Sequence, residues 1–311
     1  MSKKQVQFEL WEECNSKCKF CYLGHNNCET PVERKICGIQ NAIDVIKNLD
    51  SNEYDTVSLM GGELFQGQMS NDLVKEKYIE LIHLIHELSR KGMLKHVWIY
   101  ATLTIGDQKD LYDTLDILKD DNVWVLTSYD TLGRFHTNKM FENWEYHVKN
   151  IKTSYNVDLN ITSIITGDLI EKYLAGEFSF KHIIEKYGCS VFPKLCSLPY
   201  NLYSSKKEMN EKIGNFFPTR DNFMKFMTNL KRDDQDSYNK MFNINYRADT
   251  LYVNYKDVIL KETRHKDEWF ETDTRGIDDR LNCGHSGFYN CYIDSDKCAL
   301  CDKMILEGIQ I

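Results

Sequence analysis

A regular alternation of strand-like and helix-like segments constrains the fold of this chain more than any other feature. Short β-branched or apolar runs predict six strands, at residues 6–11, 56–60, 97–102, 123–127, 157–165 and 190–192. Apolar residues at helical spacing occupy the intervals between them. This order predicts an α/β fold in which helices connect parallel strands through right-handed crossovers. Six units are fewer than the eight of a complete barrel.

Three cysteines follow the first predicted strand, and their spacing indicates a metal centre. Cys14, Cys18 and Cys21 form a C-x3-C-x2-C sequence on a short polar stretch. Structural zinc usually takes four protein ligands, and iron–sulfur clusters usually take four thiolates. Three thiolates on one loop therefore suggest a cubane cluster with one iron open to another ligand. The alternatives are three incidental thiols, or part of a zinc site completed elsewhere.

A Gly61-Gly62-Glu63 triplet follows the second predicted strand. Two glycines allow the backbone to adopt positive φ and to approach a ligand closely, and Glu63 adds a carboxylate beside them. Taken alone, such a triplet is usually a turn. Its position after the second predicted strand, about forty residues beyond the cysteines, favours a ligand-binding role over an ordinary turn.

The cysteine spacing, the aromatic Phe20 before the third cysteine and the Gly-Gly-Glu triplet together resemble the radical S-adenosylmethionine (SAM) superfamily. The resemblance implies an open (β/α)6 partial TIM barrel. It also implies an enzyme in which Cys14, Cys18 and Cys21 hold a [4Fe-4S] cluster whose open iron binds SAM. An electron from the cluster would then cleave SAM to a 5′-deoxyadenosyl radical, which abstracts hydrogen from a substrate.

The same resemblance implies which residues contact SAM. The triplet would receive its amino group, and the end of the fourth strand would meet its ribose or carboxylate, although Ser128 and Asp130 equally fit ordinary capping of a loop. The adenine is expected near Phe20 and the sixth strand. The residues expected to bind the cofactor are Phe20, Tyr22, Gly61, Gly62, Glu63, Ser128, Asp130 and Arg134.

A second cysteine cluster lies near the end of the sequence. A C-x2-C pair can chelate one metal, and two further cysteines complete four thiolates. Zinc would make this unit a structural metal site that stabilises the fold. A second [4Fe-4S] cluster would resemble the auxiliary clusters of radical SAM enzymes, and this second interpretation is slightly favoured. His285 fits either as a zinc ligand that replaces one cysteine or as a hydrogen-bond donor to a metal ligand. The predicted ligands are Cys283, Cys291, Cys298 and Cys301.

These patterns divide the chain into a partial-barrel domain at residues 1–200, a variable α+β region at 201–282 and a cysteine-rich unit at 283–311. The variable region is expected to contain a helix opened by Pro218 and strand-like residues 246–255. Eleven cysteines without a secretion signal favour a reducing compartment, so a cytoplasmic protein without a membrane span is expected. The net charge of −8 disfavours nucleic acid as a partner.

The motifs do not name the substrate, and three hypotheses remain. The leading one is hydrogen abstraction from a peptide or protein side chain, because cysteine-rich extensions often accompany peptide substrates in the family. The second is a nucleoside- or nucleotide-modifying enzyme. The third is a catalytically silent binding protein with the SAM-family fold. In both enzymatic readings an electron donor such as flavodoxin or ferredoxin is expected.

Overall fold

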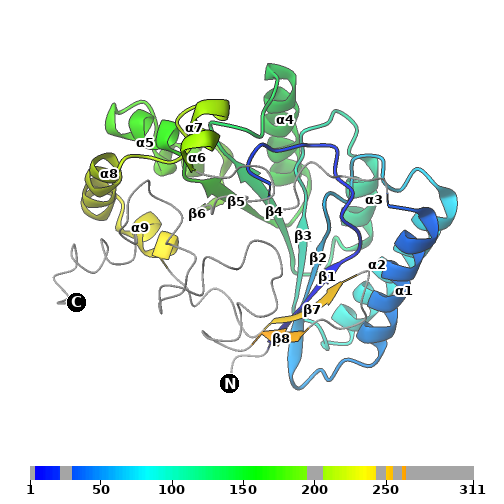
Figure 1. Ribbon diagram of the computed structural model, residues 1–311. Helices are drawn as coiled ribbons and strands as arrows, with labels where there is room; N and C mark the ends of the chain where they lie inside the picture. The colour runs from blue at the N-terminus through cyan, green and yellow to red at the C-terminus, as the bar shows by residue number, and fades with distance from the viewer. Residues whose placement is uncertain (1–3, 22–29, 195–205, 243–249, 255–260, 264–311) are drawn as a thin grey trace.

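The computed structural model describes residues 4–21, 30–194, 206–242, 250–254 and 261–263, and Figure 1 shows its elements. Strands and helices alternate from the first strand to the sixth, as the sequence predicts. In chain order they are β1 (Lys4–Glu9), α1 (Val32–Lys47), β2 (Tyr54–Met60), α2 (Asp72–Arg90), β3 (His96–Tyr100), α3 (Lys109–Ile117), β4 (Val123–Tyr129), α4 (Asn138–Ser154), β5 (Asp158–Ile164), α5 (Gly167–Leu174), α6 (Phe180–Tyr187), β6 (Ser190–Lys194), α7 (Lys206–Ile213), α8 (Arg220–Asp233), α9 (Gln235–Phe242), β7 (Thr250–Asn254) and β8 (Lys261–Thr263).

The strands form one sheet in the order β6-β5-β4-β3-β2-β1-β7-β8. Strands β1 to β6 are parallel to their neighbours throughout, which confirms the predicted open α/β sheet. Strand β7 lies parallel to β1, and β8 pairs with β7 in the antiparallel sense. The sequence predicted strand character around β7 but placed it beyond the partial barrel. The structure shows that this later segment extends the same sheet; the domain boundary at residue 200 stays a prediction.

The outer face of the sheet forms the hydrophobic core with the helices. Successive side chains of a strand point to opposite faces, so Val57 and Leu59 on β2, and Val97 and Ile99 on β3, face the same side. All four are at most 1% exposed. They pack with apolar residues of α1 to α4, including Ile43. Burying each such side chain contributes about 1.5–3 kcal/mol, so this face accounts for much of the stability.

The ends of two helices can be read from the sequence. The Asn71 side chain caps the start of α2 by accepting hydrogen bonds from the backbone N–H groups of Leu73 and Val74, a role for which the sequence offered either Ser70 or Asn71. Gly92 follows its end with a φ of +71°. Helix α8 begins at Arg220, two residues after the predicted start at Pro218, because the Thr219 hydroxyl caps it by accepting from the N–H of Asn222.

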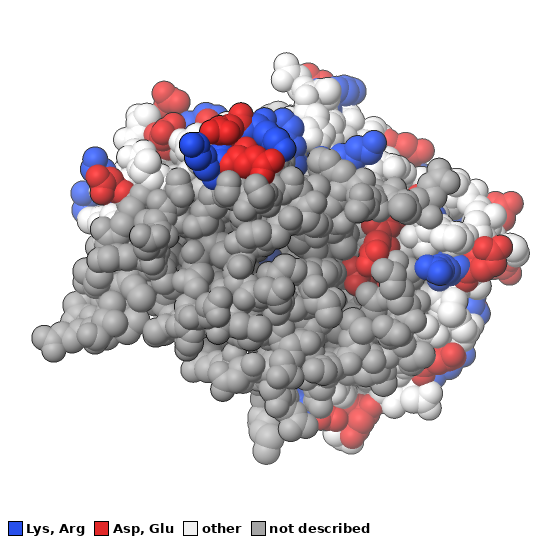
Figure 2. All heavy atoms as spheres, in the orientation of Figure 1, with Lys and Arg blue, Asp and Glu red and all other residues white. Residues whose placement is uncertain are grey.

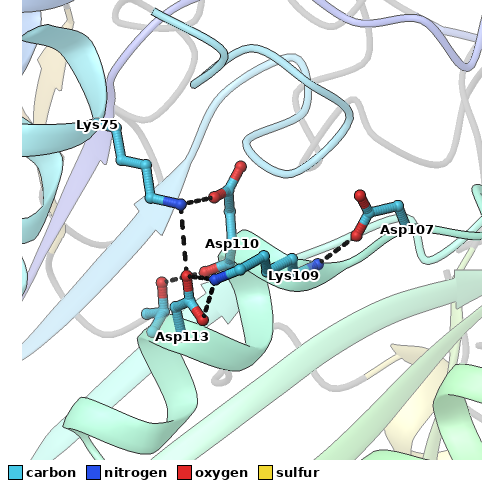
Figure 3. Close-up of polar contacts among 6 residues, drawn as sticks. Lys75, Asp107, Lys109, Asp110 and Asp113 are labelled. Atoms are coloured by element: carbon cyan, nitrogen blue, oxygen red, sulfur yellow. Dashed lines mark hydrogen bonds and ion pairs between the residues drawn. The ribbon is translucent and has the colours of Figure 1, made fainter. Parts of the chain in front are cut away.

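Charged side chains also join the helices on the outer side of the sheet (Figure 3). The Lys75 amine on α2 lies 2.6 Å from Asp110 and 3.4 Å from Asp113, both on α3. Lys109 pairs with Asp113 at 2.6 Å. All four side chains are partly exposed, so each pair contributes at most about 1 kcal/mol. Elsewhere on the described surface in Figure 2, acidic and basic side chains are intermingled.

Several predicted residues lie outside the part of the chain that the structure describes. They are Tyr22 and the C-terminal set of Cys283, His285, Cys291, Cys298 and Cys301. Within the described ranges, no helix is both long enough and apolar enough to cross a membrane.

Candidate cofactor site

The cysteine loop follows β1 at the carboxyl end of the parallel sheet. In Figure 1 it is the dark-blue segment that curves over the upper ends of the central strands. Cys14 and Cys18 are buried, and Cys21 is partly exposed. Ligands of open α/β sheets bind at this edge, because the loops after neighbouring strands meet there. The three thiols are therefore placed where a cofactor site is expected.

The Gly-Gly-Glu segment after β2 packs directly against the cysteine loop. The Gly62 N–H donates to the Trp11 carbonyl at 2.8 Å, and the Glu63 N–H donates to the Glu13 carbonyl at 2.9 Å. The Trp11 indole N–H donates back to the Glu63 carbonyl at 2.8 Å. A Cβ on Gly62 would lie 2.2 Å from the Glu12 carbonyl oxygen, and one on Gly61 would lie 2.8 Å from that of Trp11.

The glycines therefore allow close contact between two backbones. Positive φ does not explain them: neither Gly61 nor Gly62 is among the positive-φ glycines, so that part of the sequence interpretation was wrong. The reason lies in the tertiary fold, because the clashing carbonyls belong to a loop that is about fifty residues away in the sequence.

Glu63 is 3% exposed and connects this segment to the segment that follows β3. One carboxylate oxygen accepts from the N–H groups of Leu64 and Phe65, both at 3.0 Å, and the other accepts from Thr102 N–H at 2.6 Å. Burial raises the pKa of Glu63, and these hydrogen bonds oppose that shift. The Thr102 side chain is a further hydrogen-bond partner of Glu63.

Gln66 forms a second connection, which sequence reasoning missed. Its amide nitrogen lies 2.7 Å from the Ser16 hydroxyl and 2.9 Å from that of Thr102, and its oxygen accepts from the Asn15 N–H at 3.0 Å. The loop between Cys14 and Cys18 is thus fixed to the segments after β2 and β3. No spacing pattern marks Gln66, because its partners come from distant parts of the chain.

The segment after β4 holds the other side of the cysteine loop. The Lys19 N–H donates to the Gly133 carbonyl at 2.9 Å. The His136 ring donates from Nε2 to the carbonyls of Ser16 and Lys17, both at 3.0 Å. Both partners are acceptors, so Nε2 carries the proton. His136 was also not predicted, although it lies only two residues beyond Arg134.

Arg134 and Asp130 bring a charged pair to the cysteines. The Arg134 Nε lies 3.3 Å from Asp130 Oδ2, and both side chains are at most 9% exposed. The guanidinium carbon lies 5.5 Å from the centre of the Phe20 ring. Asp130 also accepts from the Arg134 N–H at 3.2 Å, so the predicted capping role is present. Ser128 lies on β4 and is half-buried.

The electrostatic environment differs between the two buried cysteines. Burial raises the pKa of Cys14 to about 11, and the nearby Glu63 charge adds to this shift. Burial raises the pKa of Cys18 to about 12, and the positive charge of Arg134 opposes it. Burial likewise raises the pKa of Asp130 to about 7, against the influence of Arg134. Metal binding must therefore displace protons from neutral thiols, and Arg134 is placed to offset the resulting negative charge.

The donor set fits an iron–sulfur cluster. Cys14, Cys18 and Cys21 influence one another electrostatically, so they lie close together. Among the described residues, no three His, Cys, Asp or Glu side chains are grouped as ligands of one metal ion. A cubane places its thiolates on different irons, so its ligands need not converge on one point.

Comparison with known proteins agrees with this description. Residues 6–153 match the model of a family described as a 4Fe-4S single cluster domain. The structure is similar to a solved structure described as native anSMEcpe with bound AdoMet, with a TM-score of 0.52 and 17% sequence identity. That match covers 80% of this chain and 64% of anSMEcpe, so the chain spans less than two thirds of that protein.

A second match is TYW1 with a lysine-pyruvate adduct bound, at a TM-score of 0.34 and 11% identity, covering 74% of this chain and 72% of that one. No curated protein matches the sequence.

An open parallel sheet with a three-cysteine loop over its carboxyl edge defines the class of partial-barrel iron–sulfur proteins. Within that class, the cysteine spacing and the Gly-Gly-Glu segment resemble the radical SAM superfamily, and residues 6–153, which match the 4Fe-4S single cluster family, contain both motifs.

Proposed function

We propose that this chain is a radical SAM enzyme that abstracts hydrogen from a peptide or protein side chain. The observation that supports SAM as the cofactor is the arrangement of charge around the cysteine loop. Glu63 influences Cys14 from one side, and Arg134 influences Cys18 from the other. SAM carries an amino group and a carboxylate on its methionine portion, so a buried anion and a buried cation beside the cysteines are complementary to it.

In this proposal Cys14, Cys18 and Cys21 hold a [4Fe-4S] cluster, which when bound supplies the electron that cleaves SAM. Glu63 accepts a hydrogen bond from the SAM amino group, which replaces the contact with the Thr102 side chain. Arg134 binds the SAM carboxylate, and Asp130 orients the guanidinium. Phe20 and Ser128 contact the rest of the cofactor, and the three segments that hold the cysteine loop keep its thiols in position.

Anaerobic reconstitution tests the proposal. We expect wild-type protein, given dithionite and SAM, to form 5′-deoxyadenosine, measured by liquid chromatography and mass spectrometry. Cys18→Ala should lose about four irons per chain and all product. Cys37→Ala is the matched control, because Cys37 is exposed on α1, and it should retain both. Fully loaded wild type that forms no 5′-deoxyadenosine would favour the silent binding protein.

Gly62→Ala provides a geometric test of the same site. The added Cβ meets backbone oxygen atoms that cannot move without displacing the cysteine loop. We expect strongly reduced iron content and SAM binding. Gly106→Ala is the control, because the nearest atom to its Cβ is 3.9 Å away and its φ is not positive. Equal iron content in the two variants would show that the loop does not need this packing.

A metal site at Cys283, Cys291, Cys298 and Cys301 is part of the proposal. Iron, sulfide and zinc are counted in wild type and in Cys298→Ala/Cys301→Ala. A loss of about four irons would indicate a second cluster. A loss of one zinc would indicate a structural staple. The substrate search would then turn to nucleosides, the alternative to a peptide.

A further inference from the structure

Ser16, which lies between the first two cysteines of the loop, is directed at the sulfur of Cys14. Its backbone N–H donates a hydrogen bond to Cys14 Sγ at 3.4 Å. Its hydroxyl is a further hydrogen-bond partner of the same side chain. Ser16 is 1% exposed and Cys14 is 8% exposed, so water scarcely competes for these contacts. One buried residue therefore offers two donors to a predicted cluster ligand.

The Gln66 amide determines which way the Ser16 hydroxyl donates. Gln66 Oε1 accepts from the Asn15 N–H at 3.0 Å, so the other atom of the amide is its nitrogen. That nitrogen lies 2.7 Å from Ser16 Oγ, and an amide nitrogen only donates. The Ser16 oxygen therefore accepts this hydrogen bond, and its own proton is available for a different acceptor.

Cys14 Sγ is the acceptor that fits that proton best. The hydroxyl oxygens of Thr102 and Thr104 each lie 3.4 Å from Ser16 Oγ, whereas an O–H···O hydrogen bond is usually about 2.5–3.0 Å long. A cysteine that binds a metal does so as a charged thiolate, and hydrogen bonds to charged acceptors are the stronger ones. The Ser16 hydroxyl thus donates to Cys14 when Cys14 is a metal ligand.

The backbone beside this group is held in a conformation that non-glycine residues rarely adopt. In the described part of the chain, the non-glycine residues with positive φ are Lys17 at +47° and Leu103 at +61°. Lys17 follows Ser16, and Leu103 lies between Thr102 and Thr104. Such a conformation is unfavourable and persists only where the surrounding contacts require it, often at functional sites. The fold therefore imposes the position of Ser16 at the cost of local strain.

We propose that Ser16 raises the reduction potential of the cluster by donating two hydrogen bonds to Cys14, and that Gln66 is the residue that positions the Ser16 hydroxyl. This inference rests on the function proposed above. One-electron reduction adds negative charge to a cluster and its thiolates, so hydrogen-bond donors to sulfur stabilise the reduced state more than the oxidised one. The cluster of this chain therefore accepts its electron more readily than it would without Ser16 and Gln66.

The experiment is a redox titration of the anaerobically reconstituted full-length protein without SAM, in which electron paramagnetic resonance measures the fraction of reduced cluster. Ser16→Ala removes the hydroxyl donor and keeps the backbone N–H. We expect the equilibrium constant for one-electron reduction to fall about tenfold, which is a midpoint potential about 59 mV more negative. A midpoint potential equal to that of wild type, in a variant that holds a full cluster, would overturn the proposal.

Thr104→Val is the matched control for the loss of a buried hydroxyl. Thr104 is 1% exposed, and its hydroxyl oxygen lies 3.1 Å from Gln66 Nε2. The substitution removes one hydroxyl of the same group but leaves both donors of Ser16 in place. Its equilibrium constant for reduction should therefore stay within about twofold of wild type. A shift as large as that of Ser16→Ala would mean that general disturbance of the loop, and not the bond to Cys14, sets the potential.

Gln66→Met tests the positioning role, because methionine has a similar length, no charge and no donor. We expect its midpoint potential to shift in the same direction as that of Ser16→Ala. In the variant that carries both substitutions, the shift should equal that of Ser16→Ala alone, since Gln66 acts through the Ser16 hydroxyl. Shifts that add in the double variant would overturn the positioning role of Gln66.

Iron and sulfide counts keep the possible failures apart. Wild type that binds no cluster, or that forms no 5′-deoxyadenosine, would contradict the proposed enzyme. Active wild type with the potential unchanged in Ser16→Ala would contradict only the role of Ser16. If neither Ser16→Ala nor Gln66→Met assembles a cluster, wild type decides by itself: electron–nuclear double resonance in deuterated buffer should detect exchangeable deuterons coupled to the reduced cluster. A spectrum without such a coupling would overturn the proposal.

Discussion

The two faces of the sheet use the same strands for different purposes. On the outer face, several polar groups among the apolar side chains have partners: the Trp144 indole N–H donates to the Thr127 hydroxyl at 3.1 Å, and both ring nitrogens of His147 are hydrogen-bonded, whereas the hydroxyls of Tyr78 and Ser163 are buried without a partner. On the inner face, Ser58, Trp98 and Asn160 each carry a buried polar atom without one. The continuous apolar core lies on the outer face, so stability resides mainly there.

Truncating a matched aliphatic residue on each face should give the largest difference. Ile99→Ala removes a side chain that is 0% exposed in the outer core and should lower the free energy of unfolding by about 2–5 kcal/mol. Leu126→Ala on the inner face should cost less, because Leu126 is partly exposed. Urea denaturation followed by circular dichroism measures both. A larger cost for Leu126→Ala would reverse the comparison.

Removing a satisfied hydroxyl from the outer face should have the next largest effect. Thr127→Val keeps the shape of the side chain but deprives the Trp144 N–H of its acceptor. Because Trp144 is fully buried, we expect a loss of about 1–3 kcal/mol in unfolding free energy. The same denaturation measurement applies. No change would mean that the Trp144 N–H finds another acceptor.

His147 should make the outer layer sensitive to acid. Its Nε2 donates to the Ile105 carbonyl and its Nδ1 accepts from the Tyr112 hydroxyl, so the ring is held neutral. Burial lowers the pKa of His147 below its usual value. The unfolded chain then binds the proton at a higher pH than the folded chain does. Stability is therefore complete above about pH 6.5 and falls as the pH decreases through the lowered pKa.

The unfolding free energy is measured from about pH 7.5 to about pH 5, a range that spans the usual histidine pKa. A decrease in this free energy toward low pH is the expected result. His147→Gln should flatten the slope, although it also changes the baseline stability. His83→Gln is the control, because His83 is exposed on α2. A slope that is the same in all three proteins would show that His147 does not titrate on unfolding.

Removing an unsatisfied hydroxyl from the inner face should have the smallest effect on stability. Ser58→Ala deletes an oxygen that is buried without a partner, so the unfolding free energy should stay within about 0.5 kcal/mol of wild type or increase. Compared with Thr127→Val, it isolates the effect of having a partner. A loss as large as that of Thr127→Val would mean that the Ser58 hydroxyl is satisfied in solution.

Much of the fold could be predicted because its signals are local. The alternation of strands and helices, the Asn71 cap and the end of α2 near Gly92 each depend on a few neighbouring residues. The addition of β7 beside β1 could not be predicted, because strand pairing joins residues that are some 245 positions apart, as for Gln5 and Thr250. Nothing in the sequence near β7 indicates which strand edge it meets.

The sequence by itself determined the cysteine spacing, the Gly-Gly-Glu segment and the parallel α/β class, since these depend on residue type and period. The tertiary structure decided what those residues do for one another. It showed that Gly62 is required by carbonyls of the cysteine loop, and that His136 holds carbonyls as many as 120 residues away. The tertiary structure also decided which side-chain hydroxyl and amide groups have hydrogen-bond partners. Periodicity is a property of neighbouring residues, whereas hydrogen bonding and burial depend on distant segments that meet only in the folded chain.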